Sequence, residues 1–338
     1  MNVRRLIPTT ALAGAVALGI VSLSACAGTS DAADKGSSGK LDVVASFYPM
    51  QYLAEQIGAG HVAVNTLTKP GVEPHDLELK PRQIGELGEA DVILYLKGIQ
   101  PAVDDAIAQA GVKNTVDAAT LTKLEAHGAE VGHEHGHEGE EHAGEEHSAE
   151  EHAAEEEGHD HSTETGTDPH IWLDPVKYAE VAKGVGTALE KADPANAADY
   201  KKNTDALVKK LGALDTEFET GLKNTTTKTF ITTHSAFGYL AERHGLEQEG
   251  ITGIDPESEP SPARIKELQD IAKKDKVSTV FFETLASDKT AKTLAGDTGL
   301  KTDVLDPLEG ITDKSKGDDY IEVMQSNLAA LKKALGAK

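Results

Sequence analysis

From residue 41 onward, short runs of aliphatic and β-branched residues alternate with stretches whose apolar positions repeat at helical spacing. In the first part of the chain we predict strands at residues 41–47, 62–67 and 91–96, and helices at 50–57 and 81–90. The second part repeats the alternation, with strands at 229–233, 279–283 and 301–305 and helices at 236–244, 265–274, 289–299 and 320–335. Strands that alternate with helices indicate parallel sheets covered by helices.

Between these two parts the pattern predicts one long helix. After a helix at 176–191, Asp193-Pro194 is a favourable start for the next, because aspartate caps a helix and proline suits its first position. Apolar residues on one face extend this helix to residue 222, about 40 Å at about 1.5 Å per residue. We therefore predict an α/β fold of two lobes, each with a mainly parallel sheet flanked by helices, joined by one long helix. The N-terminal lobe would cover 41–193, the linking helix 194–222 and the C-terminal lobe 223–338. Ligands of such sheets bind beyond the C-terminal strand ends, here in the inter-lobe cleft.

The N-terminal segment has the pattern of an export signal with a lipid attachment site. Arg4 and Arg5 precede an apolar run at 11–23 that is short for a permanent membrane span. Leu23-Ser24-Ala25-Cys26 matches the lipobox of bacterial lipoproteins, and Cys26 is the only cysteine in the chain. We predict a signal peptide at 1–25, lipidation of Cys26 and a tether at 26–40, which would anchor the protein to the extracellular face of the cytoplasmic membrane. A plain signal peptide with a chance cysteine is the alternative.

A low-complexity tract interrupts the first lobe at residues 127–167. Residues 125–164 hold fifteen acidic side chains and no Lys or Arg, and thus most of the formal net charge of −24, which argues against a nucleic-acid partner. Because almost nothing here could enter a core, we predict a disordered surface loop. Its imidazoles and carboxylates favour weak metal collection; a solvated spacer is the alternative. The tract begins at His127, and its predicted low-affinity ligands are His133, His135, His137, His142, His147, His152, His159 and His161.

Five histidines lie outside this tract, and three of them occupy loop positions of the kind that line a cleft. His75 follows the second predicted strand, His170 lies where structure resumes after the tract, and His234 directly follows a strand. The other two are His61 and His244, which we interpret as surface residues. A single histidine is weak support for a ligand, but three at such positions favour a metal site, and imidazole suits Zn²⁺, Cu²⁺ and Ni²⁺.

Several separate motifs, in order, give the chain a specific resemblance. They are Pro74-His75-Asp76-Leu77-Glu78, Asp168-Pro169-His170-Ile171-Trp172-Leu173-Asp174-Pro175, Thr233-His234-Ser235-Ala236-Phe237-Gly238-Tyr239-Leu240, Glu259-Pro260-Ser261-Pro262 and Leu305-Asp306-Pro307-Leu308-Glu309-Gly310. Over residues 41–338 the chain resembles the zinc-binding solute-binding proteins of ABC importers, in the cluster that binds Zn²⁺ or Mn²⁺. The resemblance implies that His75, His170 and His234 are the nitrogen ligands and that Glu309 is the fourth ligand. Asp306, Glu283 or water are the competing candidates for that fourth position.

The resemblance implies a binding protein without catalytic turnover. It would be a monomer that captures Zn²⁺ and delivers it to a membrane permease driven by a separate ATPase. Three imidazoles favour zinc over manganese, which prefers oxygen ligands. The alternatives are an exported zinc hydrolase, a manganese-binding protein and a zinc-dependent adhesin of the same family. A hydrolase needs an open metal position beside a general base, whereas four protein ligands would close the site.

Overall fold

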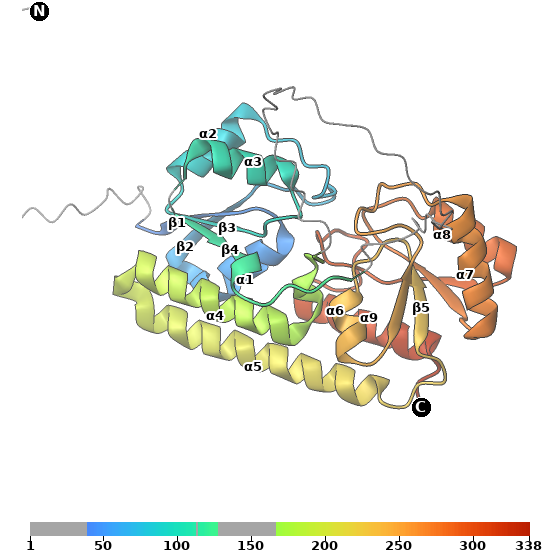
Figure 1. Ribbon diagram of the computed structural model, residues 1–338. Coiled ribbons are helices and arrows are strands. Elements are labelled where there is room, and N and C mark those ends of the chain that lie inside the picture. The colour runs from blue at the N-terminus through green and yellow to red at the C-terminus, as the bar shows by residue number, and fades with distance from the viewer. Residues whose placement is uncertain (1–38, 113, 128–166) are drawn as a thin grey trace, which may run out of the picture. The chain divides into compact units, whose positions relative to one another are not determined.

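The computed structural model describes residues 39–112, 114–127 and 167–338 (Figure 1). The described residues contain two four-stranded sheets, and every pairing of neighbouring strands is parallel. The first sheet has the order β2-β1-β3-β4 and consists of β1 (Leu41–Ala45), β2 (Val62–Thr66), β3 (Val92–Tyr95) and β4 (Thr115–Asp117). The second has the order β6-β5-β7-β8 and consists of β5 (Thr229–Thr232), β6 (Glu247–Gly250), β7 (Thr279–Phe282) and β8 (Lys301–Val304).

The two sheets therefore repeat one topology. In each, the first strand pairs with the second on one side and the third on the other, so that the chain reverses its direction of winding beside that first strand. Loops that leave the carboxyl ends of parallel strands at such a point gather around a common site. The predicted α/β class with two parallel sheets is confirmed.

Helices flank both sheets. The N-terminal lobe contains α1 (Tyr48–Gly58), α2 (Pro81–Glu89), α3 (Pro101–Ala110), α4 (Pro175–Ala192) and the short 3₁₀ turns η1 (Ala59–His61), η2 (Ala118–Thr120) and η3 (Ile171–Leu173). The C-terminal lobe contains α6 (Gly238–Arg243), α7 (Pro262–Lys274), α8 (Lys289–Thr298) and α9 (Tyr320–Ala334).

The sequence pattern does not predict one of the observed α-helices, α3, and two of the observed strands, β4 and β6. The signals for α3 are local, with proline at its first turn and Gly111 in the left-handed conformation that ends it. By contrast β6 consists of Glu-Gln-Glu-Gly, which has no apolar alternation, and it lies at the sheet edge where its hydrogen bonds to β5 define it. Such an edge strand is set by its partner rather than by its own sequence.

The long helix α5 (Ala197–Leu222) follows the 3₁₀ turn η4 (Pro194–Asn196). It packs alongside α4, contacts α1 of the N-terminal lobe and contacts α9 of the C-terminal lobe (Figure 1). Its predicted apolar face is buried, at Leu207, Leu211, Leu214 and Phe218. The helix thus joins the lobes as expected, whereas the exact lobe boundaries remain a prediction.

One apolar core runs across both lobes. It includes Phe47 and Trp172 from the N-terminal lobe together with Phe237 and Tyr320 from the C-terminal lobe, all buried. Phe47 meets Trp172 edge to face, with ring centroids 5.1 Å apart. The described residues cluster as one compact unit. The loops at the strand ends of the two lobes are therefore held near each other by shared core contacts.

Two predictions lie outside the described residues. Cys26 and the signal segment precede residue 39, and the tract from 128 to 166 is likewise not described. Of the predicted loop at 127–167, only its two end residues belong to the described part. Within the described ranges, no helix combines the length and the apolar character that a membrane span requires.

Candidate metal centre

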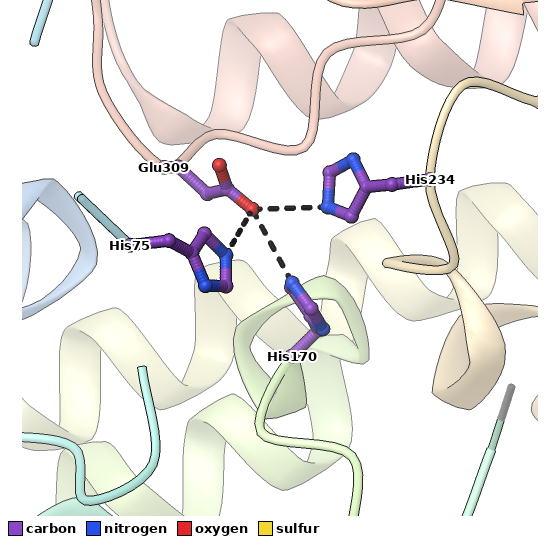
Figure 2. Close-up of side chains that lie close together, drawn as sticks. All are labelled: His75, His170, His234 and Glu309. Atoms are coloured by element: carbon purple, nitrogen blue, oxygen red, sulfur yellow. Dashed lines mark hydrogen bonds and ion pairs between the residues drawn. The ribbon is translucent and has the colours of Figure 1, made fainter. Parts of the chain in front are cut away.

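Four side chains from both lobes converge on one point (Figure 2). His75 comes from the loop after β2, His170 from the segment that precedes η3, His234 from the end of β5 and Glu309 from the loop after β8. The Oε1 atom of Glu309 lies 3.4 Å from His75 Nε2, 3.3 Å from His170 Nε2 and 3.2 Å from His234 Nε2. One carboxylate oxygen thus faces three imidazole nitrogens.

These distances match the edges of a tetrahedral zinc site. Zinc binds imidazole nitrogen and carboxylate oxygen at about 2.0–2.1 Å, so neighbouring ligand atoms in a tetrahedron lie about 3.3–3.4 Å apart. The same distances are long for hydrogen bonds between charged groups, which are usually about 2.7–2.9 Å. The spacing therefore suits four ligands around a small cation better than a carboxylate bonded to three histidines.

Burial of unpartnered polar atoms supports the same interpretation. Among the described residues, His234 Nε2 and Glu309 Oε2 are buried and have no hydrogen-bond partner. Buried polar atoms are almost always hydrogen-bonded, because an unpaired one loses its solvation without compensation. His170 and Glu309 are 0% exposed and His234 is 2% exposed. A metal ion would satisfy the nitrogen that the protein leaves unpaired.

Two carboxylates hold the imidazoles in place. Asp168 Oδ1 lies 2.8 Å from His170 Nδ1 and accepts the His170 backbone N–H at 2.9 Å. Glu283 Oε1 lies 2.8 Å from His234 Nδ1 and accepts a hydrogen bond from the Thr233 hydroxyl. A carboxylate on Nδ1 fixes the ring and keeps Nε2 directed to the metal, an arrangement common among zinc-binding histidines.

Glu309 is positioned by a strained turn. Leu308, immediately before it, has φ of 57°, a left-handed conformation that a branched residue rarely adopts. Asp306 Oδ1 accepts the Leu308 backbone N–H at 2.8 Å, and the Trp172 indole donates to the Pro307 carbonyl at 2.7 Å. Trp172 also lies beside the ring of His170, with centroids 5.1 Å apart. One buried indole thus links the loop of the carboxylate to the loop of a histidine.

The charges of the cluster depend on one another. Burial alone would raise the pKa of Glu309, but the charge of His234 and the nearby imidazoles of His170 and His75 hold it well below its usual range. Burial likewise would lower the pKa of His234, whereas Glu283 and Glu309 raise it well above 6.5. Glu73 behaves differently: burial, followed by the charge of Glu309, raises its pKa to about 9. The neutral form of Glu73 is thus favoured, because its negative form would be buried beside the charge of Glu309.

The structure separates the candidate carboxylates by position. Of the three, only Glu309 lies within the group of histidines. Glu283 contacts the outer nitrogen of His234, while Asp306 bonds the Leu308 N–H and the hydroxyls of Thr284 and Ser315. Both thus occupy the orienting positions expected of them if Glu309 is the ligand. The ligand roles themselves stay a prediction.

Sequence reasoning missed two contributors. Asp168 was recognised only as part of a motif, although its spacing of two residues from His170 is the local signal for a carboxylate that caps its own neighbour. His127, assigned only to the low-complexity tract, instead bonds Asp168 and Glu242 in the folded protein. Of the remaining described histidines, His61 pairs with Asp199 and His244 stacks on Phe218, both outside the cluster. Both are half-buried rather than the surface residues expected, because each ring packs against an aromatic side chain.

Comparison with known proteins identifies the family. Residues 43–334 match the family described as the periplasmic component A of the zinc-uptake complex. The chain is 37% identical over 323 residues to the high-affinity zinc uptake system protein ZnuA of Bacillus subtilis, covering 94% of each chain. It is 34% identical over 305 residues to the zinc-binding lipoprotein AdcA of Streptococcus pneumoniae, covering 88% of this chain but only 56%, about half, of that relative.

A solved structure agrees with this assignment. The Zn(II)-bound crystal structure of AdcA from Streptococcus pneumoniae superposes with a TM-score of 0.69 and 31% identity, over 89% of this chain and 59% of that one. The relatives are described as zinc-binding or zinc-uptake proteins rather than as enzymes. The chain belongs to the zinc-uptake component A family of binding proteins.

Proposed function

We propose that this protein captures Zn²⁺ between its lobes and delivers it to the membrane permease of an ABC importer with a separate ATPase. The observation that carries the proposal is the spacing of three Nε2 atoms at 3.2–3.4 Å around Glu309 Oε1. His75 and His170 would bind the ion from the N-terminal lobe, and His234 and Glu309 from the C-terminal lobe. The names of the relatives, which refer to zinc binding and zinc uptake, support the choice of cargo.

The ligand set favours zinc over manganese. Three neutral imidazoles and one carboxylate suit Zn²⁺, whereas Mn²⁺ prefers mostly oxygen ligands and higher coordination numbers. Competition of a fluorescent chelator against the protein, with Zn²⁺ and then Mn²⁺, tests the preference. Tighter binding of Mn²⁺ would contradict the proposal and favour a manganese-binding member of the family.

A hydrolase is the less suitable alternative because the four ligands fill the tetrahedron. Catalytic zinc sites keep one position for water, and here the buried Glu309 carboxylate would take the position that water needs. Zinc-dependent turnover of ester, peptide or phosphoester substrates by the purified protein would support the enzyme instead. We expect none.

His75 is the most accessible of the four ligands and marks the route of the ion. Its side chain is 10% exposed, against 0–2% for the others. Among the described residues it also has no carboxylate on its outer nitrogen, whereas His170 and His234 do. We propose that zinc enters and leaves past His75, whose loop connects β2 to α2 and is free of regular structure.

The N-terminal and tract predictions complete the proposal. Lipidated Cys26 would anchor a monomeric protein to the extracellular face of the cytoplasmic membrane. The name of the streptococcal relative, a zinc-binding lipoprotein, supports the anchor. The tract would gather zinc weakly, because without a fixed geometry each site must order its own ligands. Deletion of residues 128–162 should leave the tight site intact and remove weak equivalents. Loss of the tight site in that variant would contradict the ligand assignment.

A zinc-dependent adhesin remains the alternative within the family. A protein that uses zinc only for its structure should unfold on chelation, whereas a carrier must survive both the loaded and the empty state. An anomalous-scattering crystal structure of the zinc-loaded protein would test the metal, the fourth ligand and the position between the lobes together. Density for zinc at any other set of ligands would overturn the proposal.

A further inference from the structure

A second group of metal-binding side chains lies outside the buried cluster. Glu125, His127 and Glu242 each offer one ligand atom, and these atoms all lie within 4.8 Å of one another. Glu125 and His127 lie at the end of the described segment 114–127, and Glu242 belongs to α6. We refer to these three residues as the outer group and to His75, His170, His234 and Glu309 as the inner group.

One carboxylate orients a histidine in each group. Asp168 is fully buried, and its Oδ1 lies 2.8 Å from His170 Nδ1 while its Oδ2 lies 3.1 Å from His127 Nδ1. The Nε2 of His127 is thereby directed away from Asp168 and lies 3.0 Å from Glu242 Oε2. The arrangement of carboxylate, imidazole and facing carboxylate that characterises the inner group thus recurs in the outer one.

The position of His127 is built into the fold. A Cβ on Gly238 would lie 2.3 Å from the His127 Cβ and 2.8 Å from Asp168 Oδ2, so only glycine lets both approach α6. The ring of His127 packs edge-on against Tyr239, with centroids 4.5 Å apart. The Tyr239 hydroxyl donates to the Asp168 carbonyl at 2.7 Å and accepts the Glu125 backbone N–H at 2.8 Å. Two neighbouring residues of α6 therefore fix Glu125, His127 and Asp168 relative to Glu242.

Neighbouring cations moderate the charge of the outer group. Lys123 Nζ and Lys177 Nζ lie 3.4 Å and 3.6 Å from Glu125 Oε1. A metal ion bound to Glu125 would have to compete with these two ion pairs. The side chain of Glu242 is 61% exposed, so binding needs little desolvation but loses rotamer freedom. Three protein ligands leave at least one coordination position for water. The outer group should therefore bind more weakly than the inner one.

We propose that Glu125, His127 and Glu242 form a second, weaker site for a divalent metal ion such as Zn²⁺, completed by water. The site contains His127, the first histidine of the His-rich tract, and is connected to His170 through Asp168. Binding here goes beyond the proposed function and does not require it, because no ligand is shared between the two groups.

Anomalous diffraction from zinc-soaked crystals of the full chain locates the ion. We expect one peak at the inner group and a second at His127 Nε2, and the second should be missing in Glu242→Gln. Glu89→Gln, which removes the same charge from an exposed position on α2, is the matched control and should keep both peaks. An inner peak without an outer one would overturn this inference alone, whereas an outer peak without an inner one would overturn the proposed function alone.

Equilibrium dialysis with Zn²⁺ then measures whether the outer group binds zinc in solution. Glu242→Gln should remove one weak equivalent from the full chain, or weaken it at least about tenfold, while the tight equivalent is unchanged. His234→Ala should do the reverse. Equal weak binding by Glu242→Gln and Glu89→Gln would show an adventitious ion only and would overturn the inference.

Discussion

The inner and outer groups use the same residue types and the same orienting aspartate, yet their surroundings differ. The inner group has four candidate ligand side chains, of which His75 is the most exposed, at 10%. The outer group has three, and Glu242 is largely in solvent. Two lysines compete for Glu125, whereas the described neighbours of Glu309 within the cluster are histidines.

We propose from this difference that burial and ligand number, more than residue type, separate a tight metal site from a weak one. In the inner group the ligand atoms are buried, and His234 Nε2 is unpaired, so a cation stabilises them most. In the outer group, Lys123 and Lys177 already pair with Glu125, and His127 pairs with Glu242. One fold can thus place a strong and a weak site on the two oxygens of a single carboxylate.

The largest expected effect is from Glu309→Gln. This variant keeps the side-chain volume but removes the charge that faces all three histidines, so zinc affinity of the inner group should fall by more than about a hundredfold, beyond the loss typical for an orienting partner. The outer group should be unaffected. Chelator competition measures the zinc affinity of the inner group, and equilibrium dialysis measures zinc binding by the outer group. If Glu309→Gln bound zinc with wild-type affinity, water or another carboxylate would be the fourth ligand instead of Glu309.

Asp168→Asn should weaken both groups at once, by about 10–100-fold at the inner one. The amide keeps the shape of the side chain but offers only one accepting oxygen for two histidines. Glu283→Gln is the matched control, because Glu283 orients His234 and has no contact with the outer group. If Asp168→Asn weakened zinc binding only at the inner group, Asp168 would not orient a metal-binding histidine in the outer group.

Zinc affinity should depend on pH more steeply at the inner group. Protons and zinc compete for imidazole nitrogen, so affinity falls as pH falls, by up to about three protons per ion at the inner group and about one at the outer. In the metal-free protein, burial would lower the pKa of His170, but Asp168 and Glu309 raise it, so the competition begins above pH 6.5. Chelator competition between pH 8 and pH 6 measures both slopes. Equal slopes would contradict the assignment of three imidazoles to one group only.

The smallest expected effect is on the fold when metal is removed. The apolar core that joins the lobes does not contain the inner group, so chelation should leave the far-ultraviolet circular dichroism spectrum nearly unchanged. Zinc should still raise the melting temperature by mass action, with about 4 kcal/mol of stabilisation at a free concentration a thousandfold above Kd. Unfolding on chelation would identify the inner group as a structural zinc site.

Much of the site could be predicted because its residues follow strands or lie in motifs. His75 and His234 come after strands whose apolar runs are visible in the sequence, and His170 lies in a dense motif. Glu309, in contrast, required the family resemblance, since Asp306 and Glu283 have similar local settings. The hydrogen bond from the Trp172 indole to the Pro307 carbonyl, which helps to position the Glu309 loop, links residues 135 apart in the chain.

The sequence by itself determined the alternation of strands and helices, the long helix and the three histidines, because each depends on local periodicity or on a position at a strand end. The tertiary structure decided which carboxylate faces the histidines and that Asp168 serves two of them. It also decided that His127 leaves the tract to meet Glu242, 115 residues away. Such pairings arise only when packing brings distant loops together, and no local pattern encodes the distance between them.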